Sequence, residues 1–121
     1  MISAQWARSF AAEWIAAWNA HDLERILSHY TDDFEMHSPL IIERMGVSSG
    51  ALRCKAAVRP YWQRSFEARP ALQFELHDVL VGVDSIAIYY FSVARIKMVT
   101  ELLRFNEQRQ VVYSAALYSQ P

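Results

Sequence analysis

Hydrophobic and polar positions follow a helical period at the start of the chain. Large aromatic residues recur at every fourth position: Trp6, Phe10, Trp14 and Trp18. Such a stripe is typical of an amphipathic helix packed on a core, and it predicts a first helix that begins near Ser3. After a break at residues 19–21, Asp22 can cap a short second helix that ends at His29.

The period changes toward two over residues 30–37, which predicts a strand that stops at Ser38-Pro39. Residues 40–53 contain two glycines and predict a loop. Helical spacing returns over residues 58–69, so we expect a third helix there. Pro60 lies inside this helix and should kink it or mark its true start.

The rest of the chain has the pattern of four strands joined in a meander, at residues 72–81, 85–94, 97–105 and 110–118. The apolar parity slips within the first of them, which predicts a β-bulge near His77 and Asp78 and therefore a curved strand. A curved antiparallel sheet with helices on its inner face encloses a cone. We therefore predict an α+β fold in the order α-α-β-α-β-β-β-β, with a cavity that aromatic side chains can line.

Length and charge exclude several classes of protein. A chain of 121 residues fits one domain. Lys and Arg number 12 against 13 Asp and Glu, so the overall basic surface needed for nucleic acid or a membrane is missing. No segment has a membrane-spanning or leader pattern, and we expect a cytoplasmic location. Cys54 is alone and gives no sign of an oxidising compartment.

Glu101 is the most informative candidate for chemistry. It shares a strand face with Val99, Leu103 and Phe105, and an apolar face is costly for a carboxylate. Burial raises the pKa of such a group, which can then act as a general acid, a general base or a neutral hydrogen-bond donor. The alternative is a structural carboxylate paired with a Tyr or an Arg.

Two histidines are weaker candidates. His37 shares a strand face with Glu35, and a His near a carboxylate suits proton transfer, so we take His37 as a second candidate catalytic residue at the rim. An exposed strand-end His with no role is the alternative. His77 lies at the predicted bulge, where a side chain can turn toward a cavity or remain a surface residue.

Aromatic and apolar side chains could form a ligand cage, a plain core, or both. We expect ten residues to line the pocket: Trp14, Trp18, Tyr30, Tyr61, Trp62, Phe66, His77, Tyr89, Leu103 and Phe105. The partner expected for such a pocket is a small, largely apolar molecule. The four histidines lack metal-site spacing, and no nucleotide-binding motif occurs, so we expect neither a metal nor a cofactor.

The order of elements and several runs resemble the SnoaL-like branch of the nuclear-transport-factor-two-like superfamily. The resemblance covers nearly the whole chain and rests on residues 18–23, 30–34, 38–39, 55–59, 61–62, 74–76, 78–85 and 100–102. It implies a cone-shaped fold, commonly a homodimer, with a pocket between the sheet and the first and third helices. In the enzymes of this superfamily, pocket carboxylates, His and Tyr move protons without a cofactor.

Three positions depart from the pattern of the family. Cys54 replaces a usual Gly before the third helix, Pro60 enters that helix, and residues 114–117 lack a His-Ala-His that often precedes the final Tyr, here Tyr118. The last departure removes polar groups from the expected pocket. Two functions therefore stay open, a cofactor-independent isomerase, cyclase or lyase and a non-catalytic ligand-binding or scaffold protein.

Overall fold

Four helices and six strands make up the fold, which a computed structural model describes for all residues from Met1 to Pro121. The helices are α1 (Ala4–Asn19), α2 (Leu23–Leu27), α3 (Pro39–Met45) and α4 (Lys55–Ala68). The strands are β1 (Tyr30–His37), β2 (Ala51–Arg53), β3 (Phe74–Val81), β4 (Ser85–Ser92), β5 (Lys97–Phe105) and β6 (Val111–Tyr118). No helix is both long and apolar enough to cross a membrane.

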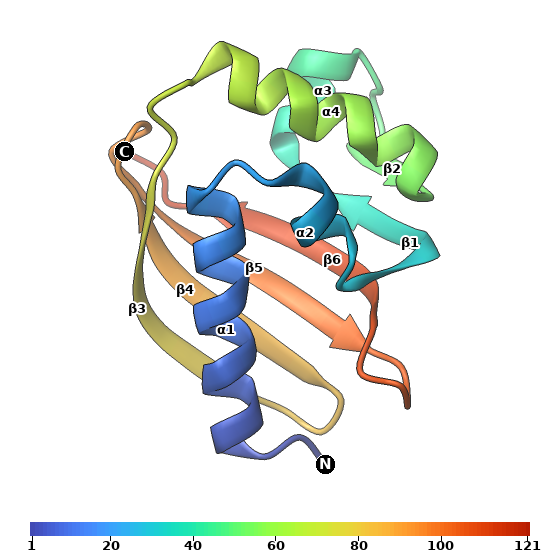
Figure 1. Cartoon of the computed structure of the whole chain (residues 1–121). Coiled ribbons are helices and arrows are strands. Elements are labelled where there is room, and N and C mark those ends of the chain that lie inside the picture. Colours follow the sequence, from blue (N-terminus) through green and yellow to red (C-terminus); the bar gives the residue numbers. More distant parts are fainter.

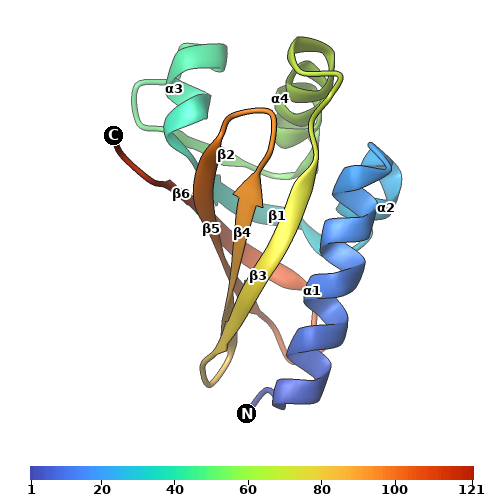
Figure 2. The same cartoon turned by 90° about the vertical axis from the view of Figure 1, so that its left-hand side faces the viewer.

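All six strands form one curved sheet in the order β2-β1-β6-β5-β4-β3. The last four strands form the predicted antiparallel meander, whereas β1 pairs with β6 in parallel. Helix α1 lies along the inner face of this sheet, and α3 and α4 lie at the end where the C-terminus is (Figure 1). The opposite, outer face of the sheet has no helix over it (Figure 2). This arrangement confirms the predicted α+β cone.

Side-chain caps explain where the first two helices begin. The Ser3 hydroxyl accepts a hydrogen bond from the Trp6 backbone N–H at 3.1 Å, and the Asp22 carboxylate accepts one from Arg25 N–H at 3.1 Å. Each cap satisfies a backbone donor that a helix start leaves free. Helix α2 ends at Leu27, two residues before the predicted end at His29.

The prediction of a loop over residues 40–53 is wrong, because this segment contains α3 and β2. The Ser38 hydroxyl caps α3 by accepting from Leu40 N–H at 3.2 Å, and Pro39 occupies the first helical position, which it suits. Gly46 ends the helix with a left-handed φ of 66°. Strand β2 then pairs antiparallel with β1 at the edge of the sheet.

The third predicted helix is α4, which begins at Lys55, three residues earlier than its apolar spacing indicates. Pro60 lies inside the helix and does not mark its start. The residue before the helix, Cys54, has φ of 73° and ψ of 154°, a conformation that is almost confined to glycine. The Gly that the resemblance leads us to expect at this position would therefore fit the backbone better than Cys54 does.

The predicted bulge is confirmed by a register shift between Leu76 and Asp78 where β3 pairs with β4. In strands β4 to β6, successive side chains point alternately to the inner and the outer face of the sheet. Tyr90 pairs with Val99, and Val99 pairs with Tyr118, all on the inner face. The intervening residues, such as Tyr89 and Leu117, point outward and are exposed.

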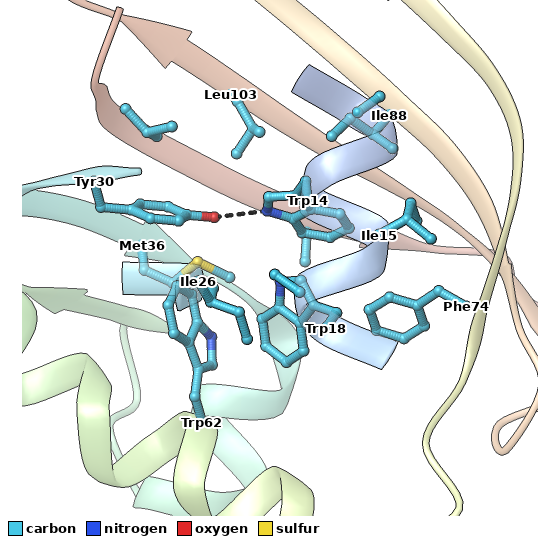
Figure 3. Packing of buried hydrophobic residues seen from close by; sticks show 14 of the residues in the cluster. Trp14, Ile15, Trp18, Ile26, Tyr30, Met36, Trp62, Phe74, Ile88 and Leu103 are labelled. Carbon is cyan, nitrogen blue, oxygen red and sulfur yellow. Dashed lines mark hydrogen bonds between the residues drawn. The ribbon is translucent and has the colours of Figure 1, made fainter. Parts of the chain in front are cut away.

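A dense aromatic core fills the closed part of the cone (Figure 3). Trp14 is nearly inaccessible, and its indole Nε1 donates a hydrogen bond to the hydroxyl of buried Tyr30 at 3.0 Å. Trp18 packs edge-on against Trp62, with ring centroids 5.2 Å apart. Helix α1 is thereby fixed to β1 and α4, which sets the position of the cavity described next.

Candidate functional site

A cavity of about 40 Å³ lies between the inner face of the sheet and helices α1, α3 and α4. Most of its lining is apolar and aromatic, including Trp18, Tyr61 and Trp62. The polar and charged side chains that reach it are Ser65, Ser92, Arg95 and Glu101. The cavity is therefore an apolar chamber with a few polar groups, the usual character of a small-molecule site.

Glu101 reaches this cavity from the middle of the sheet. On β5 it pairs with Ile88 of β4 and Ala116 of β6, both buried. Burial raises the pKa of its carboxyl from 4.5 to about 8, although a hydrogen bond from Tyr90 acts in the opposite direction. The group is consequently protonated at neutral pH and titrates just above it.

Three tyrosines surround the carboxyl with neutral hydroxyl groups. Burial raises the pKa of Tyr61 to about 12 and shifts the pKa of Tyr90 and Tyr118 upward as well. The Tyr61 hydroxyl donates to Ser38 Oγ at 3.2 Å. These phenols therefore remain protonated at all ordinary pH values, and because the O–H of Tyr61 is bonded to Ser38, Tyr90 and Tyr118 are the ones that can donate into the cavity.

Three of the residues that line this cavity each have a buried polar atom without a hydrogen-bond partner in the protein. These atoms are the indole Nε1 of Trp18, the hydroxyl Oγ of Ser92 and the carboxyl Oε2 of Glu101. An unpaired buried polar group costs about 1 to 3 kcal/mol, so such groups are rare and normally meet a ligand or a water molecule. Their common location marks the cavity as the candidate site.

Only some of the residues predicted to line the pocket do so. Trp18, Tyr61 and Trp62 line the cavity together with Glu101. The others on the inner side belong to the surrounding core and do not border the cavity: Trp14, Tyr30, Phe66, Leu103 and Phe105. These five side chains support the site by packing behind its walls.

His37 lies on the other side of the sheet from Glu101. Its Nε2 is 2.7 Å from Glu35 Oε2, both side chains are partly exposed, and its ring lies 5.2 Å from that of Tyr113. The hydrogen bond from His37 lowers the pKa of the Glu35 carboxyl. Met36 points inward at this strand and lines the cavity instead, so the structure does not bring His37 and Glu101 together.

His77 and Tyr89 also lie outside the cavity. Both are exposed, and their rings contact each other edge-on with centroids 6.2 Å apart. The bulge at His77 bends β3 without turning this side chain inward. Tyr90, the neighbour of Tyr89, occupies the inner position that the sequence assigns to Tyr89.

Ten of the lining residues are absent from the predicted set, and they include Tyr90, Ser92, Arg95 and Tyr118. Tyr90 and Ser92 have the same parity as Ile86 and Ile88 along β4, so the alternation contains the signal. Arg95 lies in the turn after β4, where no periodicity applies. Its guanidinium stands 5.9 Å from the centroid of the Tyr118 ring.

The arrangement is suited to proton transfer and to binding an oxygen atom. A protonated Glu101, the Ser92 hydroxyl and the Trp18 N–H are each able to donate a hydrogen bond to a ligand. No three His, Cys, Asp or Glu side chains gather in a way that could hold a metal ion.

Comparisons with known proteins give a consistent family. Residues 11–114 match the family model of the SnoaL-like domain. A SnoaL-like protein of unknown function from Burkholderia thailandensis E264 is 45% identical, with 98% of each chain covered and a TM-score of 0.94. No curated protein matches the chain.

More distant solved structures share the fold alone. A candidate isomerase of the SnoaL-like family from Agrobacterium tumefaciens is 12% identical, with a TM-score of 0.75 over 94% of this chain and 97% of that one. A candidate ketosteroid isomerase from Kribbella flavida is 14% identical, with a TM-score of 0.72 over 95% of this chain and 78% of that one.

Proposed function

The chain belongs to the SnoaL-like family, and from this premise we propose that its inner cavity binds the carbonyl group of a small organic molecule and that Glu101 exchanges a proton with it. The reaction class is cofactor-independent acid–base chemistry, namely an isomerisation, a cyclisation or a dehydration. The observation that carries the proposal is the set of unpartnered polar atoms of Trp18, Ser92 and Glu101 in one cavity.

The chemistry follows from the protonation state of Glu101. As a carboxylate, it takes a proton from the carbon next to the carbonyl, and the electrons of that C–H bond pass to the carbonyl oxygen. The hydroxyl of Ser92 and the indole N–H of Trp18 are the free donors available to stabilise the negative oxygen that forms. Return of the proton to another atom completes an isomerisation.

The volume of the cavity limits the part of the ligand that reaches Glu101. At about 40 Å³ it is much smaller than the roughly 150 Å³ of an engineered cavity that holds benzene. The inner chamber thus accepts a group of a few atoms. A steroid or another large ring system fits only if wall residues move.

A non-catalytic binding protein is the second candidate function. It is favoured by residues 114–117, which lack the His-Ala-His that the family resemblance leads us to expect before Tyr118. Glu101 would then act only as a hydrogen-bond partner for the ligand. Proton exchange distinguishes the two functions, because a binder does not accelerate it.

The test uses cyclopentanone and butanone as small neutral ketones in D₂O, with loss of the α-proton signal followed by NMR. The proposal expects exchange faster than in buffer alone, with a rate that rises as the pH passes about 8, since the ionised carboxyl is the base. Glu101→Gln should abolish the acceleration, whereas Glu75→Gln on the exposed side of β3 should retain it. Binding without exchange would support the binder, and neither binding nor exchange would contradict both.

We also propose that the outer face of the sheet is the interface of a homodimer. Tyr89 and Leu117 flank Thr100 across three strands, and the adjacent row contains Ala87, Leu102 and Ala115. Tyr89, Leu102 and Leu117 are exposed, although large and mostly apolar. The centre of this face is uncharged and apolar, so it suits contact with the same face of a second copy of the chain. A twofold interface pairs a surface with itself in this way.

A further inference from the structure

A second pocket of about 430 Å³ lies beside the inner cavity. The two spaces share the lining residues Leu40, Arg95 and Tyr118, so they are direct neighbours. The outer pocket lies within the usual size range of small-molecule sites, which is roughly 300 to 1,000 Å³. It can hold the body of a ligand whose small polar end enters the inner cavity.

Positive charge dominates this outer pocket. Arg69, Arg95 and Lys97 line it, whereas Glu43 is the only acidic residue in its lining. The chain as a whole has a net charge of −1, so this local excess of cations is not a general property of the surface. A pocket lined in this way attracts anions.

None of these three cations is paired with a carboxylate. The five ion pairs of the structure lie elsewhere and involve Arg25, His29, His37, Lys55 and Arg59. Arg69 makes only a long 3.4 Å bond to the carbonyl of Ala94, and its Nε is buried without a partner. Guanidinium donors that are partly buried and unpaired are unfavourable unless an anion meets them.

The cations also affect one another. Burial lowers the pKa of Arg95, and the neighbouring positive charges of Arg69 and Arg44 lower it further. Arg44 donates to Ser65 Oγ at 2.6 Å, which holds another guanidinium at the same end of the cone. Like charges held together destabilise the free protein, and a bound anion relieves that repulsion.

We propose that the ligand is a small organic anion, with its carboxylate or phosphate group bound by Arg69, Arg95 and Lys97 in the outer pocket while its carbonyl end enters the inner cavity. This inference rests on the proposed function, since it takes Glu101 as the group that meets the carbonyl. The protonated state of Glu101 is compatible with such a ligand, because it adds no negative charge near the anionic head. The sequence led us to expect a largely apolar ligand, and this proposal adds an anionic group at one end of it.

The test uses 4-oxopentanoate, which carries a ketone and a carboxylate, and its methyl ester, which lacks the charge. 3-Oxobutylphosphonate provides the same ketone with a phosphate-like head and distinguishes the two kinds of anion. Binding is measured by backbone amide shifts in NMR titrations at low salt. We expect at least one charged probe to bind tenfold or more tightly than the ester, with a smaller advantage at high salt.

Three variants test whether the tighter binding of the charged probe depends on the outer pocket. Arg95→Gln and Arg69→Gln should each reduce it, and Arg95→Lys should restore part of it because the charge remains. Arg104→Gln is the matched control, since Arg104 is exposed on the outer face beside Tyr113 and its loss changes the net charge equally. Circular dichroism verifies that each variant is folded.

The outcomes separate this inference from the proposed function. If ester and acid bind equally and Glu101→Gln weakens both, the anion site is refuted while the inner cavity retains its role. The inference also fails if Arg104→Gln reduces the advantage as much as Arg95→Gln does. If no probe perturbs the wild-type protein, both proposals are wrong.

Discussion

Tyr90 of β4 and Glu101 of β5 face the same cavity from adjacent strands. Tyr90 pairs with Val99 and Glu101 pairs with Ile88, so the phenol lies diagonally beside the carboxyl on the inner face. Hydrogen bonding from Tyr90 lowers the pKa of Glu101, but burial outweighs it and leaves a net rise. The balance between these two effects determines the pH at which this acid changes state.

The first prediction is that Glu101→Gln removes a pH dependence of stability. With a pKa of about 8 in the folded protein and 4.5 as its ordinary value, Glu101 keeps a proton that the unfolded chain has lost. Its contribution is full below about pH 4.5 and is lost as the pH rises through about 8. The wild type should lose on the order of 1 kcal/mol per pH unit in this window relative to the variant.

Urea unfolding at pH 5, 6, 7 and 8 measures this difference. The variant should be the more stable protein at pH 8, because it has no carboxyl to ionise in the core. Glu75→Gln serves as the control, since that side chain is exposed. Parallel stability curves for wild type and Glu101→Gln would show that the carboxyl is not raised in pKa.

The second prediction concerns the backbone at Cys54. With φ of 73° and ψ of 154°, this residue is strained by its Cβ, and glycine relieves the strain. Cys54→Gly should stabilise the protein by about 1 kcal/mol after the greater freedom of glycine in the unfolded chain is subtracted. Cys54→Ala keeps the Cβ and should give no such gain, which thermal melts of both variants will reveal.

The third prediction is that Tyr30→Phe destabilises the fold without affecting ligand binding. It removes the acceptor of the Trp14 indole N–H, which is buried and has no other partner. A loss of about 1 to 3 kcal/mol is expected from an unsatisfied buried donor. Tyr113→Phe on the outer side should cost much less, and equal losses would mean that the Trp14 bond contributes little.

The fourth prediction tests the homodimer. Leu117→Glu places a charge in the middle of the apolar outer face, where Leu117 is 54% exposed, and should convert the dimer to a monomer. Val83→Glu adds the same charge at the exposed β3–β4 turn and should leave the dimer intact. Sedimentation equilibrium decides, and a wild-type protein that is monomeric at every concentration would rule the interface out.

The sequence predicts those parts of the fold that depend on long periodic patterns. The stripe of Trp6, Phe10, Trp14 and Trp18 extends over more than three helical turns, and α1 follows it from Ala4 to Asn19. Helix α3 has only seven residues and buries only Ile41, so no period could reveal it. The sequence features that mark this helix are local, namely a Ser-Pro pair at its start and a Gly at its end. The same residue types also end strands, so they do not identify a helix by themselves.

The candidate site depends on three-dimensional proximity that one strand cannot encode. Val99 and Leu103 beside Glu101 indicate its burial, which the structure bears out. The alternation of residues along β1 separates His37 from Met36 but does not tell which of the two faces the core. Met36 faces the core because it lies on the same side of the strand as buried Phe34. Arg69 and Arg95 are distant in sequence, and the sequence gives no sign that the Arg69 guanidinium bonds to the carbonyl of Ala94, the residue before Arg95.

The parallel pairing of β1 with β6 has a consequence for synthesis of the protein. Strand β1 pairs with residues 111–115 of β6, the last of the six strands in sequence, so its main neighbour in the sheet is made after all the other strands. During translation, helices α1 and α2 and strand β1 therefore emerge long before the strand that joins them to the meander. The sheet becomes continuous only after β6 has been made, so the strands made earlier cannot complete their cooperative fold before that point.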